Sequence, residues 1–133
     1  SHTEGVSIDL VVASAPGYIV AHSWTDLQIH VFWINGQHLL STVLPTRIEC
    51  MITNSTGLVL ITGSSHGLLS FREIWSLQEL YSIDMNENGA IRSLAFTEDQ
   101  QYLLVGSEDG TFSVATDPEA RWRSFNFALQ KTP

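Results

Sequence analysis

Three consecutive segments of the 133-residue chain carry the same arrangement of apolar residues and turns, and this repeat constrains the fold most strongly. The segments open at Ile8, Ile48 and Ile91, which are 40 and 43 residues apart. Aligned without a gap, they match at Val11/Met51/Leu94, Val12/Ile52/Ala95, Val20/Leu60/Leu103, Ile29/Leu69/Phe112, Val31/Phe71/Val114 and Ser23/Gly63/Gly106. A period of about 40 to 45 residues made of short alternating strands is typical of a β-propeller blade. The sequence therefore predicts an all-β propeller fragment of three consecutive four-stranded antiparallel blades.

The partial propeller is expected to occupy the whole chain, 1–133, with blades at about 6–45, 46–89 and 90–133. Turn signals separate the strands of each blade. Asn35-Gly36 and Asp109-Gly110 are hairpin signals because these residue types tolerate positive φ, and Pro45 interrupts the chain between two blades. The expected strands are 8–14, 18–22, 27–34 and 37–43, then 48–53, 58–62, 68–74 and 79–83, then 91–96, 102–106, 111–116 and 122–127.

The charge balance argues against several classes of partner. There are 14 Asp and Glu against 6 Lys and Arg, a net charge of −8, which repels nucleic acids and anionic membrane surfaces. The longest apolar stretches fall far short of the ~18 residues of a membrane-spanning helix, so we expect no direct membrane insertion. The single cysteine, Cys50, cannot form an intrachain disulfide, which fits a cytoplasmic location.

Four tryptophans lie near the predicted turns and blade edges. They are expected to seal contacts between blades, since a propeller core forms where one twisted sheet packs on the next. Trp24 lies in a turn and has an alternative role as an exposed anchor for a partner protein. The four are Trp24, Trp33, Trp75 and Trp122.

One rim of the propeller is the predicted interaction surface. The turns between second and third strands align across the blades and gather there with the connectors between blades, and such loops often carry function. The candidate protein-interaction residues are Trp24, Thr25, Asp26, Arg47, Ser65, His66, Glu108 and Asp109. The negative net charge favours a protein partner with basic peptide segments. The alternative is that each of these is a solvated turn. The acidic pair Glu98 and Asp99 is expected on the opposite rim.

Residue patterns that carry catalysis are weak in this chain, so we predict no enzyme, cofactor or metal site. His22, His30, His38 and His66 show no compact ligand spacing, and no Gly-x-Ser-x-Gly motif occurs. An enzymatic or ligand-binding propeller of another family stays an alternative, since such proteins use polar residues on the innermost strands. Here those strands carry mainly aliphatic residues, apart from the equivalent positions Asp9, Glu49 and Arg92, which are expected to face the axial channel.

The third segment, AIRSLAFTEDQQYLLVGSEDGTFSV, is similar to the WD-repeat pattern. The Trp-Asp pair that gives the repeat its name is absent, because the aligned positions hold Phe32-Trp33, Arg72-Glu73 and Ala115-Thr116. The resemblance therefore implies degenerate WD repeats, in which the family's hydrogen-bond tetrad is incomplete. Asp26 and Asp109 occupy the region of its turn aspartate.

A second resemblance covers nearly the whole chain. The chain resembles the C-terminal propeller of BEACH-domain proteins of the neurobeachin and neurobeachin-like type. Three stretches carry this resemblance: HVFWINGQHLLS, ITGSSHGLLSFREIWSLQELYSI and ARWRSFNF. The resemblance implies a non-enzymatic interaction scaffold at the end of a large cytosolic protein that acts in vesicle trafficking and membrane sorting. It also implies a cytoplasmic location, peripheral to endomembranes through the rest of the protein. The alternative is a purely structural, ring-completing fragment without a ligand of its own.

Three blades do not close a ring, since propellers have about four to eight. Two apolar blade faces are then left open. We expect either the rest of the propeller or self-association to cover them.

Overall fold

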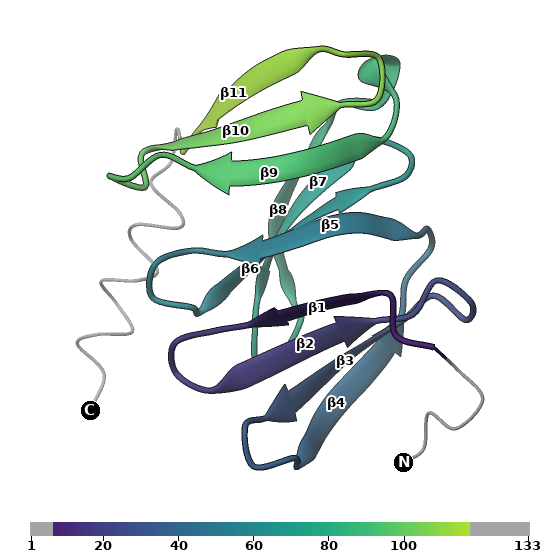
Figure 1. Cartoon of the computed structure of the whole chain (residues 1–133), viewed down its shortest axis with the longest axis vertical. Helices are drawn as coiled ribbons and strands as arrows, with labels where there is room; N and C mark the ends of the chain where they lie inside the picture. The colour runs from purple at the N-terminus through teal and green to yellow at the C-terminus, as the bar shows by residue number, and fades with distance from the viewer. Residues whose placement is uncertain (1–6, 118–133) are drawn as a thin grey trace.

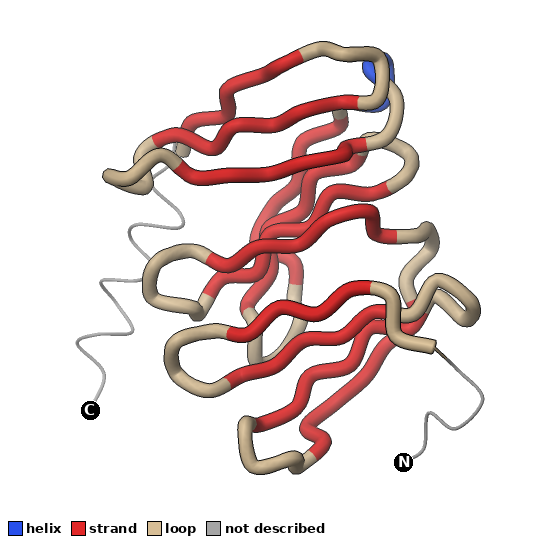
Figure 2. Tube along the Cα trace, in the orientation of Figure 1, coloured by secondary structure: helices blue, strands red, loops and turns tan. Residues whose placement is uncertain are grey.

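Three β-sheets follow one another along the long axis of the molecule in a computed structural model that describes residues 7–117 (Figures 1 and 2). The first sheet contains β1 (Leu10–Ala13), β2 (Tyr18–His22), β3 (Gln28–Trp33) and β4 (His38–Val43). The second contains β5 (Ile48–Thr53), β6 (Val59–Ser64), β7 (Leu68–Glu73) and β8 (Glu79–Asp84). The third contains β9 (Ile91–Phe96), β10 (Tyr102–Ser107) and β11 (Phe112–Thr116).

Within each sheet, every strand pairs antiparallel with its neighbour in sequence, as successive hairpins require. This topology confirms the predicted all-β class and the stacking of blade-like sheets. The strand bounds agree with the predicted ones to within two residues. The third sheet has three described strands, because the expected strand at 122–127, with Trp122, lies outside the described residues. A short 3₁₀ helix, η1 (Asn86–Asn88), lies in the connector between the second and third sheets.

The first strands of the three sheets are neighbours, with β5 between β1 and β9. Around them the alternating side chains form two separate cores. One lies between the first and second sheets and includes Val20, Val31 and Leu60; the other lies between the second and third sheets and includes Phe71 and Leu103. Apolar faces of adjacent sheets therefore bury each other, which is the packing that the repeat predicts.

One detail of the ungapped alignment is wrong: the second strand of the first sheet is displaced by one residue. The turn after β1 runs from Ser14 to Tyr18, whereas the corresponding turn after β5 runs from Asn54 to Val59 and is one residue longer. His22, and not Ser23, pairs across the sheet as Gly63 and Gly106 do. The structural equivalents are therefore Ile19/Leu60/Leu103, Val20/Ile61/Leu104 and His22/Gly63/Gly106.

The next turn of the first sheet compensates for this difference. His22 and its partner Ile29 are seven positions apart in the sequence, whereas Gly63 and its partner Leu69 are six positions apart. The extra residue lies in the loop that contains Trp24, and the third strands are again in the predicted register. The loop ends at Leu27, whose φ of 61° corresponds to the positive φ of Gly67 and Gly110 in the other two loops.

Candidate protein-interaction rim

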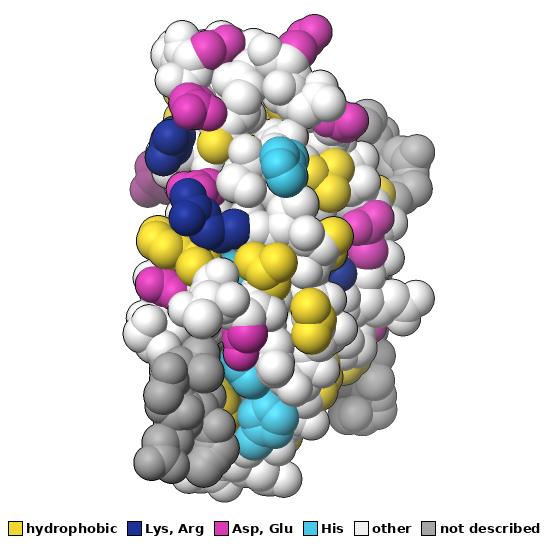
Figure 3. Space-filling model, turned by 90° about the vertical axis from the view of Figure 1, so that its right-hand side faces the viewer, with side chains coloured by type: hydrophobic (Ala, Val, Ile, Leu, Met, Phe, Trp, Pro, Cys, Tyr) yellow, Lys and Arg dark blue, Asp and Glu magenta, His cyan; other side chains and the backbone are white. Residues whose placement is uncertain are grey.

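The β2–β3, β6–β7 and β10–β11 turns and both connectors between sheets lie along one edge of the molecule, the right-hand edge in Figure 1. We call this edge the rim. All eight candidate residues lie on it, because β2, β6 and β10 end there and each new sheet begins there. Figure 3 shows this edge face on, with basic, acidic, histidine and hydrophobic side chains close together. Their placement agrees with the predicted gathering, and their role in binding stays a prediction.

Trp24 both joins two sheets and reaches solvent. Its indole Nε1–H donates to the carbonyl oxygen of Ile48 over 2.7 Å, and its backbone N–H donates to Asp9 Oδ2, also over 2.7 Å. The guanidinium of Arg47 lies 4.5 Å from the indole ring centroid, a cation–π distance. The side chain nevertheless keeps 37% of its surface exposed. Trp24 thus contributes to the contact between two blades while part of it stays exposed, and its alternative role as an anchor for a partner protein stays a prediction.

Ion pairs continue from Arg47 across the second and third sheets. Arg47 Nη2 lies 2.7 Å from Glu49 Oε2, and Arg92 Nη1 lies 3.6 Å from Glu49 Oε1. Arg92 Nη2 then lies 3.3 Å from Glu108 Oε2. We call this series, Arg47, Glu49, Arg92 and Glu108, the ion ladder. The carboxylate of Glu49 is only 8% exposed, so the two arginines satisfy a charge that would be costly to bury alone.

The last turn of the rim is fixed by its own carboxylates. Glu108 Oε1 accepts a hydrogen bond from the backbone N–H of Ala90, and this bond, together with Arg92, lowers the pKa of Glu108. Asp109 accepts from the backbone N–H of Thr111 over 2.8 Å and from Asn88 Nδ2 over 3.2 Å, and hydrogen bonds to Thr111 and Asn88 lower its pKa. Both carboxylates therefore hold the β10–β11 turn against the preceding connector while remaining exposed and charged.

The remaining candidates are held through the backbone. The N–H of Ser65 donates to the carbonyl of Arg47 over 2.8 Å, which places the β6–β7 turn beside the first connector. The His66 side chain is exposed. Thr25 is exposed as well, and Asp26 Oδ1 accepts from the N–H of Gln28 in an Asx turn.

Sequence reasoning missed the contribution of His22, which is fully buried at the end of β2. Its Nδ1 lies 2.9 Å from the carbonyl oxygen of Gln28 and donates to it, and its Nε2 accepts from the N–H of Ile48 over 3.1 Å. Burial lowers the pKa of His22, which keeps the ring in the neutral form that this pairing needs. Ile48 is therefore held at its N–H by His22 and at its carbonyl by Trp24. A histidine aligned with two glycines was the available sequence signal, but the one-residue shift concealed it.

The cations of the described residues are all engaged. Arg47 and Arg92 belong to the ion ladder, and Arg72 lies 3.9 Å from Glu79. On the rim, Asp26, Asp84, Glu87 and Asp109 have no salt bridge to a basic side chain within the described residues. The rim therefore presents a surplus of negative charge beside one partly exposed indole.

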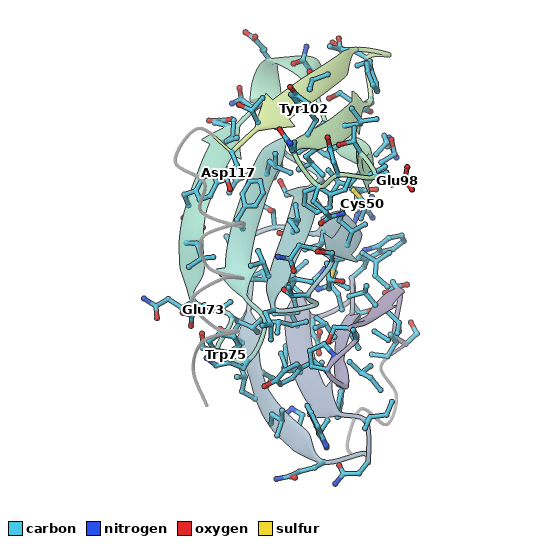
Figure 4. All side chains as sticks on the ribbon, turned by 90° about the vertical axis from the view of Figure 1, so that its left-hand side faces the viewer. Cys50, Glu73, Trp75, Glu98, Tyr102 and Asp117 are labelled. Atoms are coloured by element: carbon cyan, nitrogen blue, oxygen red, sulfur yellow. The ribbon has the colours of Figure 1, made fainter. Side chains whose placement is uncertain are left out.

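The opposite edge has a different character. The β9–β10 turn forms a shallow hollow lined by Thr97, Glu98, Asp99 and Tyr102, and it places the acidic pair away from the rim as predicted (Figure 4).

Two further tryptophans pack against apolar or aromatic side chains. Figure 4 labels Trp75, which packs against the first core. Trp33 lies in an edge-to-face contact with Tyr18, with ring centroids 5.0 Å apart.

No group of three or more His, Cys, Asp or Glu side chains is arranged to hold a metal ion between residues 7 and 117. In the same part of the chain, no helix has the length and apolar character needed to cross a membrane.

The chain resembles known proteins in sequence and in fold. No family model matches the chain. BEACH domain-containing protein B of Arabidopsis thaliana is 31% identical over 116 residues, which is 85% of this chain but only 4% of that relative. The solved structure of U3-55K has a TM-score of 0.77 at 23% identity, and the WD40 repeats of RRP9 have 0.76 at 24%; each covers 90% of this chain, and 38% and 37% of the respective structure.

A third structure, the computationally designed Ika4 protein, has a TM-score of 0.67 at 20% identity, covering 83% of this chain and 66% of that one. At these identities the structures establish the fold alone, which is that of WD40 repeats. The sequence relative is a BEACH domain-containing protein, so the comparisons agree with both resemblances found in the sequence. The chain is a run of WD-repeat propeller blades that is similar in sequence to a small part of a BEACH domain-containing protein.

Proposed function

We propose that the chain is a protein-interaction scaffold and that the rim binds basic peptide segments of a partner protein. The observation that supports this most directly is the charge of the rim. Its two arginines are already paired within the ion ladder, whereas Asp26, Asp84, Glu87 and Asp109 keep charge that no basic side chain of the described residues neutralises. A Lys- or Arg-bearing segment supplies the missing positive charge.

Trp24 adds an apolar contact to this electrostatic surface. The indole is already fixed by Ile48 and Arg47, so little conformational entropy is lost when a partner covers its exposed part. Preorganised aromatic residues of this kind commonly carry a large share of binding energy. The proposed binding mode is therefore an aliphatic stem packed on Trp24 and basic groups placed against the neighbouring carboxylates.

A binding experiment with matched double variants tests the rim. A fluorescent arginine-rich peptide is titrated with the chain, and binding is followed by anisotropy at two salt concentrations. The variant Glu87→Gln/Asp109→Asn removes two rim charges, and the control Glu98→Gln/Asp99→Asn removes two charges from the opposite edge. Each pair contains an exposed glutamate and an aspartate whose Oδ1 closes an Asx turn, and asparagine keeps that acceptor.

We expect the rim variant to bind at least about 10-fold more weakly and the control to bind like the original chain, since charge complementarity acts at short range in salt. Equal weakening by both variants would show that binding reflects net charge alone. A peptide that binds neither the chain nor the variants would contradict the proposal, and it would favour the ring-completing alternative.

The wider role proposed here is in vesicle trafficking and membrane sorting, in the cytoplasm at the periphery of endomembranes. It is supported by the relation to a BEACH domain-containing protein, of which the chain spans 4%. Proximity labelling with the full-length parent protein tests it, using the same two double variants. Loss of trafficking neighbours with the rim variant, but not with the control, is the expected result. An unchanged set of neighbours would separate the rim from that role.

A further inference from the structure

The outermost strand of the first sheet, β4, has one unpaired edge. It pairs with β3 alone, at the end of the sheet away from β1 (Figure 1). A chain end does not create this edge, because β3 precedes β4 and β5 follows it. Neighbouring blades do not cover it either, since adjacent sheets pack face to face around the two cores. The edge of β4 therefore lies on the outer circumference of the propeller.

The free edge presents backbone hydrogen-bonding groups at known residues. The N–H of Leu44 donates to the carbonyl oxygen of Leu27 over 2.9 Å, so Leu44 directs its backbone groups toward β3. Backbone direction alternates along an antiparallel strand, so Val43 and Ser41 direct their N–H and C=O groups away from β3. No backbone hydrogen bond within residues 7–117 involves these four groups. Such a row of donors and acceptors is a template for another strand.

The β4 edge also lacks the charges that usually prevent strand addition. Exposed edge strands commonly carry charged side chains that oppose pairing with another chain. The corresponding outer strand of the second sheet, β8, begins at Glu79 and ends at Asp84, both of which are exposed. In contrast, residues 27–46, which include all of β4, contain no Asp, Glu, Lys or Arg. The first blade therefore offers an edge that the second blade protects.

The charge beside β4 indicates which kind of strand fits. Asp26 precedes Leu27, which is hydrogen-bonded to Leu44 at the rim end of β4. The carboxylate of Asp26 has no salt bridge to a basic side chain of the described residues. Strands lie about 4.8 Å apart, so a lysine or arginine on a strand added to β4 can reach it. The β4 strand of a second copy supplies no such cation, because it lies in the uncharged stretch.

We propose that β4 binds an extended segment of a partner protein as an additional antiparallel strand. Antiparallel pairing is the more stable direction per residue, and it places the first residues of the segment at the rim end, near Asp26. The segment therefore begins with a lysine or arginine and continues with apolar and β-branched residues. This goes beyond the side-chain recognition proposed for the rim, because the affinity comes mainly from backbone hydrogen bonds.

A matched pair of peptides tests the backbone pairing. A labelled peptide with the sequence Arg-Lys-Val-Thr-Val-Thr-Val is titrated with the chain and followed by fluorescence anisotropy. The control peptide has the same sequence and charge but carries N-methyl groups on alternate residues, which remove the donors of one edge. Methylation of the edge that faces β4 should weaken binding at least about 10-fold, and methylation of the other edge should not. A purely electrostatic attraction to the acidic chain would not distinguish these peptides.

Two proline variants locate the binding edge. Ser41→Pro removes one outward N–H without removing a bond to β3, at a position where an edge strand tolerates proline. Ser82→Pro is the matched control, because Ser82 pairs with Ser70 in the second sheet as Ser41 pairs with His30 in the first. We expect Ser41→Pro to weaken binding at least about 10-fold and Ser82→Pro to leave it unchanged. Urea unfolding verifies that both variants are folded.

Hydrogen exchange in the unmodified chain gives a result that no folding defect can imitate. Peptide binding should slow exchange of the Ser41 and Val43 amides and leave that of Ser82 unchanged. A peptide that does not bind, or that binds without this protection, would overturn the proposal. So would a dimer of the chain that Ser41→Pro dissociates, because the edge would then belong to a second copy. The rim variant Glu87→Gln/Asp109→Asn should bind this peptide normally, so the two proposals fail independently.

Discussion

The two junctions between adjacent sheets use different chemistry at the same place. At the first junction, His22 accepts a hydrogen bond from the N–H of Ile48, and Trp24 donates one to its carbonyl oxygen. At the second, the position of His22 is occupied by Gly63, and a Cβ there would lie 2.7 Å from Ile91 Cβ, closer than real atoms approach. One junction is thus held by directional hydrogen bonds and the other by direct contact of backbone with an aliphatic side chain. Equivalent positions in a repeat can serve one interface by two physical routes.

The largest expected effect comes from filling the close contact of the second junction. Gly63→Ala should reduce the free energy of unfolding by about 2–3 kcal/mol, because the added methyl group must displace Ile91 in a packed core. Urea unfolding measures the change. Gly106→Ala is the matched control: it lies at the equivalent position of the third sheet, where the nearest atom is the rotatable Ser93 hydroxyl. A loss as large in the control would mean that the contact with Ile91 does not set the cost, because the entropy of the unfolded chain favours alanine over glycine at both positions.

At the first junction, removing hydrogen bonds should lower the free energy of unfolding, whereas at the second junction filling a close contact should lower it. His22→Leu keeps apolar volume but leaves the buried N–H of Ile48 without an acceptor, whereas the carbonyl of Gln28 still accepts from the N–H of Ser23, so we expect a loss of about 2 kcal/mol. The measurement is again unfolding in urea. If the variant is as stable as the original chain, the His22 bonds do not hold the junction.

Lowering the pH should destabilise the first junction and leave the second junction unchanged. Because burial lowers the pKa of His22, the unfolded chain takes up the proton at a higher pH than the folded one. Stability is therefore lost as the pH falls through the ordinary histidine range near ~6.5 and toward the lowered value. Burial also lowers the pKa of His30, so this residue too makes the protein less stable as the pH falls. Thermal unfolding between pH 7.5 and pH 5 should show a smaller decrease in His22→Leu than in the original chain.

The smallest expected effect concerns the ion ladder, which the second junction has and the first lacks. Glu49→Gln removes the charge between Arg47 and Arg92 but leaves the packing intact. Since both arginines are about half exposed, we expect a loss of about 0.5–1 kcal/mol that shrinks in high salt. Unfolding at low and high ionic strength checks this. A loss that is unaffected by salt would assign the effect to a hydrogen bond and not to charge.

The repeat allowed the three blades and the identity of the rim to be predicted, because strands reverse at every turn and side chains alternate along each strand. It did not reveal the shift in β2. Ile19 and Val20 are both apolar, so sliding the strand by one residue leaves the hydrophobic pattern almost unchanged although it exchanges the two faces. The pairing of His22 with Ile48 was hidden for the same reason. The ion ladder escaped prediction because it depends on side-chain reach between sheets.

The paired change in turn length also limits how such blades can be re-engineered. The first blade is one residue shorter at one edge and one residue longer at the rim, where the added residue accompanies Trp24. Transplanting the Trp24 loop alone into another blade would rotate the following strand onto its wrong face. Exchanging both turns together keeps the side chains of every following strand on their original faces. Grafting the Trp24 loop onto another blade therefore requires two changes, one in the loop itself and one in the turn at the other end of the preceding strand.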